Sequence, residues 1–187
     1  MAILKVLEKG TYLTFQLEDE IFAVDVRNVH EVLEFSTVTK IPGVPDFVRG
    51  IINLRGRVVP VVDLRLKFSM SETVKTQNTC VIVLGIGSGD NEAVIGALAD
   101  SVKEVFEFET GQVEPPPRIG SLSNSNYIKG IGKRDDQFII LLNINQVFSS
   151  DEVVLLGATA GEGVTEDDEF TVEGEEKVPD DQEGASI

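Results

Sequence analysis

Two residues in this sequence carry the side chains most often used in catalysis, and each lacks the partners that catalysis requires. His30 is the single histidine and Cys80 the single cysteine of the 187 residues. A zinc site needs several such ligands, and nucleophilic catalysis needs a base beside the nucleophile. His30 lies in an alternating run, so we expect it on the outer face of a strand. Cys80 opens an apolar run and is expected to be a buried thiol.

Carboxylates and glycines are weaker candidates for chemistry. Asp63 or Asp100 acting with Arg55 would suit a small hydrolase, but the two carboxylates are expected on separate units without a base or metal ligand. Residues 85–90 resemble a phosphate-binding loop in glycine content, but they lie between two strands and no Lys-Ser/Thr follows. A hairpin loop is expected there. The sequence therefore predicts no catalytic residue, no metal site and no cofactor.

Composition and charge exclude several classes of function. The chain has 42% hydrophobic and 26% charged residues and a net charge of −16. Such acidity disfavours binding to nucleic acid or to anionic lipid. With one cysteine and no apolar run long enough for a signal peptide or a membrane span, we expect a cytoplasmic protein without direct membrane insertion.

Charge also divides the chain into two parts. Residues 157–187 hold eleven acidic residues and one basic residue, Lys177, with few large apolar side chains. A segment of this composition cannot bury enough surface to fold, so we predict a disordered acidic tail over 157–187. The folded domain is predicted over 10–156.

The elements that must position any functional side chain are short β-branched runs separated by turn residues. Strands are predicted at ten places: 12–17, 21–26, 29–35, 50–54, 58–62, 80–86, 93–99, 102–108, 127–131 and 138–144. Helical signals occur at 144–147 and 151–156, after capping candidates Ser149, Ser150 and Asp151. The fold is therefore predicted to be mainly β with a short C-terminal helix.

The two halves of the predicted domain resemble each other. Residues 29–35 resemble 102–108 at an offset of 73, whereas 47–51 resemble 127–131 and 58–64 resemble 138–144 at an offset of 80. Two similar five-strand units follow. Because small barrels leave few free edges, we predict two five-stranded β-barrel subdomains that are interleaved and packed side by side.

Arg55 stands out in a stretch that is rich in proline, glycine and arginine. Residues 53–57 are predicted to form a hairpin turn in which Gly56 adopts a positive φ. The guanidinium of Arg55 would then be held on a short, rigid loop. It could bind a carboxylate within the protein or present its donors to a partner, and the sequence does not decide between the two.

Six motifs over residues 10–156 make this chain resemble the CheW family of bacterial chemotaxis coupling proteins. They are Tyr12-Leu-Thr-Phe-Gln-Leu, Ile21-Phe-Ala-Val-Asp-Val, Ile41-Pro-Gly-Val-Pro, Arg49-Gly-Ile-Ile-Asn-Leu-Arg-Gly, Pro60-Val-Val-Asp-Leu and Phe138-Ile-Ile-Leu-Leu-Asn-Ile. The resemblance implies SH3-like barrels and a non-catalytic adaptor. Such an adaptor joins chemoreceptor cytoplasmic tips to the regulatory domain of a chemotaxis histidine kinase, in membrane-associated receptor arrays. The acidic tail lies outside the family pattern.

The resemblance also implies where the partners bind. The receptor-binding groove is expected to include five residues: Val29, Gly50, Arg55, Cys80 and Val105. The kinase is expected to dock on an apolar edge that includes Val26, Glu31 and Val32. An exposed strand edge also predicts weak self-association. An adaptor of the same fold that serves surface motility or a second-messenger pathway is the alternative within this family, and a small hydrolase is the alternative outside it.

Overall fold

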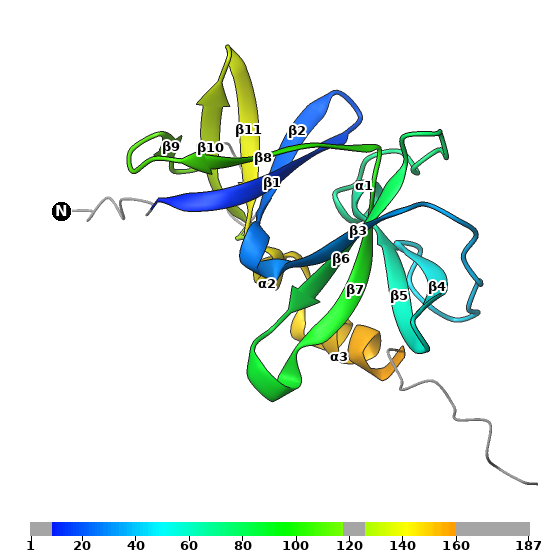
Figure 1. Cartoon of the computed structure of the whole chain (residues 1–187). Coiled ribbons are helices and arrows are strands. Elements are labelled where there is room, and N and C mark those ends of the chain that lie inside the picture. The colour runs from blue at the N-terminus through cyan, green and yellow to red at the C-terminus, as the bar shows by residue number, and fades with distance from the viewer. Residues whose placement is uncertain (1–8, 118–125, 160–187) are drawn as a thin grey trace, which may run out of the picture.

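The chain folds into short strands with a few helical turns and one C-terminal helix (Figure 1). The computed structural model describes residues 9–117 and 126–159. Its elements in chain order are β1 (Gly10–Leu17), β2 (Glu20–Asp25), the 3-10 helix η1 (Val26–Asn28), β3 (Val29–Glu34), β4 (Val48–Leu54), β5 (Arg57–Asp63), α1 (Leu64–Lys67), β6 (Cys80–Ile86), the 3-10 helix η2 (Gly89–Asn91), β7 (Ala93–Ala99), β8 (Ser101–Phe108), β9 (Val113–Glu114), β10 (Ile128–Arg134), β11 (Gln137–Leu142), α2 (Ile144–Val147) and α3 (Ser150–Thr159).

These strands form two sheets, which confirms the predicted mainly β fold. The first sheet has the strand order β8-β1-β2-β11-β10-β9, and the second has the order β3-β6-β7-β5-β4. Every predicted strand is present, and the two-residue β9 is the strand that the sequence does not predict. Within the described residues, no backbone ladder joins the two ends of either sheet. Each sheet is therefore open in its backbone hydrogen bonding. The apolar side chains on its inner face nevertheless form a core.

Strand register confirms the internal repeat. Ile51 pairs with Pro60 between β4 and β5, and Ile131 pairs with Ile140 between β10 and β11, at the same offset of 80 residues. The second strand of each hairpin also pairs in parallel with a further strand: β5 with β7, and β11 with β2. The repeats are interleaved, because the first sheet combines β1 and β2 from the start of the chain with β10 and β11 from the end (Figure 1).

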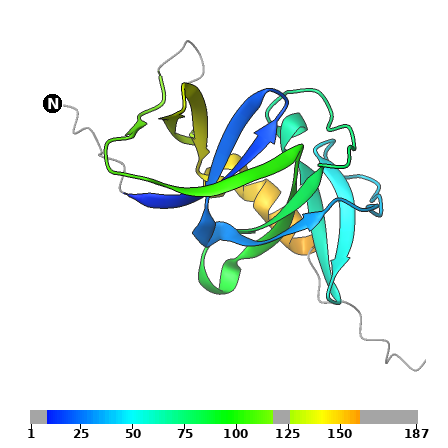
Figure 2. The same ribbon diagram turned by 45° about the horizontal axis from the view of Figure 1, so that its top comes forward.

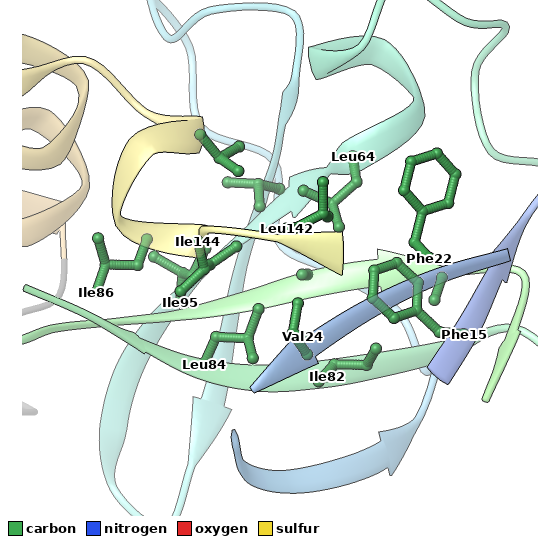
Figure 3. Close-up of a cluster of buried hydrophobic side chains, with 14 of the residues drawn as sticks. Phe15, Phe22, Val24, Leu64, Ile82, Leu84, Ile86, Ile95, Leu142 and Ile144 are labelled. Carbon is green, nitrogen blue, oxygen red and sulfur yellow. The ribbon is translucent and has the colours of Figure 1, made fainter. Parts of the chain in front are cut away.

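Three apolar clusters hold the two sheets. The largest lies between them, where Phe15, Phe22 and Val24 of the first sheet face Ile82 and Leu84 of the second (Figure 3). A smaller cluster fills the inner face of the second sheet and draws on all of its strands: Leu33, Ile52, Val61, Val81 and Leu98. The inner face of the first sheet holds the corresponding cluster: Tyr12, Ile21, Ala23, Phe108, Ile139 and Leu141. Burial of these side chains is the main contribution to stability.

Helix α3 packs against β5 and β7 and contributes Val153 and Leu156 to the central cluster (Figure 2). Its start is a capping box, because the Ser149 hydroxyl accepts from the Glu152 amide while a Glu152 carboxylate oxygen accepts from the Ser149 amide. The helix extends to Thr159, past the domain boundary predicted at 156. The rest of the predicted tail, residues 160–187, lies outside the described residues. No described helix is long and apolar enough to cross a membrane.

Candidate partner-binding site

The eight predicted binding residues are spread over both sheets. Three of them lie on β3 (Val29, Glu31 and Val32), and the other five lie in η1 (Val26), β4 (Gly50), the β4–β5 turn (Arg55), β6 (Cys80) and β8 (Val105). Strands β3 and β8 are end strands, one in each sheet. The surroundings of each residue decide what it can offer to a partner.

Arg55 is bound to a carboxylate of its own chain. The β4–β5 turn places Arg55 at φ 51° and Gly56 at φ 83°, and the Asn53 side-chain oxygen accepts a hydrogen bond from the Gly56 amide. The two terminal nitrogens of Arg55 donate to the two carboxylate oxygens of Glu31 at 2.7 and 2.9 Å. This hydrogen bonding raises the pKa of the Arg55 guanidinium. Of the two roles left open by the sequence, the intramolecular one is therefore present.

The Arg55–Glu31 ion pair joins the two ends of the second sheet. Glu31 lies on β3 at one end of the strand order, and Arg55 follows β4 at the other end. Side chains thus close this sheet where the backbone ladder does not. Beneath the ion pair lies a cavity of about 150 Å³, lined by His30, Glu31, Leu54, Arg55, Arg57, Val59, Val83 and Val94. The Arg55 side chain is 76% exposed and that of Glu31 24%, so the guanidinium remains accessible to a partner.

Gly50 has a structural reason for being glycine. Its φ is +145°, and a Cβ there would lie 2.8 Å from the carbonyl carbon of Thr39 and closer still to its oxygen. Thr39 pairs with Ile51 through two backbone hydrogen bonds of 2.9 and 2.8 Å. Gly50 therefore allows the loop after β3 to bind along β4, and its contribution to any partner surface comes from the backbone.

Val32 and Val105 are exposed apolar side chains at equivalent positions of the repeat. They lie 73 residues apart, on the end strands β3 and β8, and are 42% and 55% exposed. Val32 pairs with Ile82 in its sheet, and Val105 pairs with Leu13 in the other. Among residues 9–117 and 126–159, each sheet therefore presents a valine beside an unpaired strand edge, a feature typical of docking surfaces.

The remaining predicted residues are less accessible. Val26 and Val29 are half-buried against the central cluster between the sheets. Cys80 is 8% exposed, which agrees with the predicted buried thiol, and its Sγ lies 3.8 Å from the Ala99 carbonyl oxygen. Burial raises the pKa of this thiol. Cys80 therefore contributes to packing and offers little surface for direct contact with a partner.

The groups considered for hydrolysis are engaged in separate structural contacts. Asp63 is fully buried and accepts hydrogen bonds from Arg49 and from the amide and hydroxyl of Thr73. Asp100 accepts from the Glu18 amide at 2.6 Å and pairs with Arg65. Within the described residues, neither carboxylate forms a hydrogen bond or an ion pair with Arg55, which binds Glu31. This arrangement connects loops and sheets and forms no common reactive centre.

His30 and the glycine-rich loop lie where the sequence predicts them. His30 is exposed on β3 and lies 3.1 Å from a Glu92 oxygen. The loop connects the antiparallel strands β6 and β7 as a hairpin, with η2 inside it. Among the described residues, no group of three or more His, Cys, Asp or Glu side chains is arranged to hold a metal ion.

Two features of the site have no counterpart in the sequence-based predictions. Arg49 pairs with the buried Asp63 and with Glu72, and Arg134 pairs with Glu104 on β8. Asp63 caps α1 through the amides of Arg65 and Leu66, and an aspartate directly before a helix is a sequence signal for that role. The partners of the arginines depend on strand order and have no local signal.

Comparison with known proteins places this architecture in a family. The family model described as "CheW-like domain" matches residues 11–152. The chain belongs to the CheW-like family. The "Chemotaxis protein CheW" of Klebsiella aerogenes is 34% identical over 149 residues, covering 80% of this chain and 87% of the relative. That of Helicobacter pylori is 29% identical over 140 residues, covering 75% and 82%.

A solved CheW structure has the same fold. The scaffolding protein TtCheW from Thermoanaerobacter tengcongensis matches with a TM-score of 0.66 and 33% identity, over 75% of this chain and 92% of that one. The CheW resemblance of the motifs is thereby confirmed. A chemotaxis scaffold is the function class that the fold and the family support.

Proposed function

We propose that this CheW-like protein is a non-catalytic adaptor that couples chemoreceptor cytoplasmic tips to the regulatory domain of a chemotaxis histidine kinase. The observation that carries the proposal is the pair of exposed valines, Val32 and Val105, at equivalent positions on the two end strands. An adaptor must bind two partners at once. Two docking edges on one rigid core meet that requirement.

The kinase-binding surface is proposed to include Val26, Glu31 and Val32. An unpaired edge strand with an exposed valine is complementary to a barrel of the same kind, which is the expected build of the kinase regulatory domain. The receptor-binding groove is proposed to include Val29, Gly50, Arg55 and Val105, with Cys80 packed beneath it. Because Arg55 of one surface holds Glu31 of the other, we infer that the two surfaces influence each other.

The absence of catalysis and the location of the protein are parts of the same proposal. Asp63 and Asp100 are engaged in structural hydrogen bonds, which supports a scaffold role. A net charge of −16 disfavours nucleic acid as a partner. Binding to receptor tips would bring the protein to cytoplasmic, membrane-associated receptor arrays, and the free strand edges would allow weak self-association.

Titration of the full chain with a receptor cytoplasmic fragment and, separately, with a kinase regulatory domain tests the proposal. Val32→Lys should weaken kinase binding at least tenfold and Val105→Lys receptor binding at least tenfold, because a charge replaces apolar contact at each edge. Val154→Lys is the matched control, since Val154 is 71% exposed on α3, a helix that packs against β5 and β7. Wild-type protein that binds neither partner would refute the adaptor function.

A further inference from the structure

The first sheet contains a counterpart of the Arg55–Glu31 ion pair. Arg134 ends β10 and lies with its terminal nitrogen 3.0 Å from a carboxylate oxygen of Glu104 on β8. Glu104 is equivalent to Glu31 at the repeat offset of 73 residues. Arg134 lies one residue before the equivalent of Arg55, which is Asp135. Each sheet thus has an arginine at its last hairpin paired with a glutamate on its end strand.

The hairpin geometry explains why the arginine is displaced by one position. Asp135 and Asp136 occupy the turn with φ of 49° and 61°, as Arg55 and Gly56 do in the other hairpin. Since an aspartate takes the place of Arg55, the cation is supplied by the end of the strand instead. Its guanidinium also lies over the Phe106 ring, with its Cζ 4.5 Å from the ring centroid. Two contacts therefore hold Arg134 against β8.

Equivalent residues also line the cavity below each ion pair. Strands β1 and β2 correspond to β6 and β7, since Thr14 pairs with Ala23 as Val83 pairs with Gly96. Thr14, Ile21 and Ile139 therefore line the cavity of the first sheet where Val83, Val94 and Val59 line that of the second. The volume is about 340 Å³ in the first sheet against about 150 Å³ in the second. The end strand β8 therefore borders a larger cavity than β3 does.

The ion pair lies where the backbone pairing of β8 is interrupted. Register between β1 and β8 shifts between Leu13 and Phe15, opposite the segment that contains Glu104. There the Thr14 hydroxyl donates to the Glu104 carbonyl and accepts from the Glu104 amide, at 2.8 and 3.1 Å. A side chain thus replaces ladder bonds at the bulge. Val105, the exposed valine of this strand, is the next residue.

We propose that Arg134 and Glu104 are positioning residues that hold the bulged part of β8 and so fix Val105 for binding to a partner. The inference rests on the proposed adaptor function and extends it to a second pair of residues. The Arg134–Glu104 ion pair would serve the receptor-binding edge as the Arg55–Glu31 ion pair serves the β3 edge. Neither residue needs to contact the partner itself.

Hydrogen exchange combined with binding titrations of the full chain tests this proposal. Arg134→Ala and Glu104→Ala should speed amide exchange in β8, leave β3 unchanged, and weaken binding of a receptor cytoplasmic fragment about three- to tenfold. Binding of the kinase regulatory domain should stay within twofold. The charge-swapped double variant Arg134→Glu with Glu104→Arg should restore the part of both losses that comes from the ion pair, because it preserves that pair but loses the contact of Arg134 with the Phe106 ring. Lys133→Ala, which removes an exposed neighbouring cation, is the matched control.

Each result decides a separate part of the inference. Unchanged β8 exchange in Arg134→Ala would show that the ion pair does not hold the strand. Faster exchange with unchanged receptor affinity would show that β8 order does not matter for docking, and either result overturns the proposal. Wild-type protein that binds no receptor fragment would refute the adaptor function and the docking role of Val105, whereas the exchange data would still decide whether Arg134 holds β8.

Discussion

The Lys67 ammonium of α1 donates to both carboxylate oxygens of Glu152 in α3, at 2.6 and 2.7 Å. Both side chains are mostly buried, and Lys67 also lies over the Phe47 ring. This ion pair attaches the C-terminal helix to the connection after β5. Helix α3 is therefore held by charge-assisted hydrogen bonds as well as by its apolar packing.

The Lys67–Glu152 ion pair predicts a pH-dependent contribution to stability. Burial raises the pKa of Glu152, but hydrogen bonds from Lys67 and Ser149 outweigh it, and the net pKa lies below its ordinary value of 4.5. A lowered pKa in the folded state gives stability that is present above about pH 4.5 and lost as the pH falls through the folded pKa. The free energy of unfolding of Glu152→Gln should therefore be about 1 kcal/mol below wild type at pH 7 and converge with it in acid.

Denaturant titrations between pH 3 and pH 7 measure this difference. Asp19→Asn, at an exposed turn position, is the control and should follow the wild-type curve. A gap between Glu152→Gln and wild type that stays constant over the whole range would contradict the assignment.

Arg55→Lys separates geometry from charge at the Arg55–Glu31 ion pair. Lysine retains the charge but cannot donate two parallel hydrogen bonds to Glu31. If the paired geometry shapes both proposed surfaces, receptor affinity should fall about tenfold and kinase affinity by a smaller factor. Isothermal titration with each partner measures the effect. Arg57→Lys, in the same cavity wall, should change neither affinity, and equal affinities in Arg55→Lys and wild type would exclude a geometric role.

Gly50→Ala tests the contact between β4 and the loop after β3. Gly50 and Gly56 both have positive φ, but a Cβ at Gly56 meets nothing within 4 Å whereas one at Gly50 meets Thr39. Gly50→Ala should therefore cost about 1–3 kcal/mol more stability than Gly56→Ala, the range for overpacking. Chemical denaturation gives both values. Equal losses would show that backbone strain alone matters at Gly50.

Cys80 should be inert in the folded protein. Its thiol is buried and has a raised pKa, so a thiol-specific reagent should label it slowly until denaturant is added. Cys80→Ser should lower the free energy of unfolding by about 1–3 kcal/mol, because a buried hydroxyl replaces the thiol. Rapid labelling of the native protein would place Cys80 at the surface and make it a direct contact of the receptor groove.

The sequence by itself determined the strands, the repeat and the family. Alternation of apolar and polar residues reports which residues share a face, because successive side chains of a strand point to opposite sides. The same signal placed His30 outside and Cys80 inside. The turn at Arg55 and Gly56 was also readable, since a two-residue hairpin needs positive φ at its centre.

Only the tertiary structure decided which strands are neighbours. The repeats interleave, so β2 pairs with β11 from the far end of the chain, and no local pattern encodes that choice. Strand order in turn brings the β4–β5 turn to β3, which gives Arg55 the partner Glu31, and brings Arg134 to Glu104. Ion pairs between distant segments depend on which strands pair with each other along the backbone. The alternation of apolar and polar residues in a sequence shows only which side of a strand each residue faces.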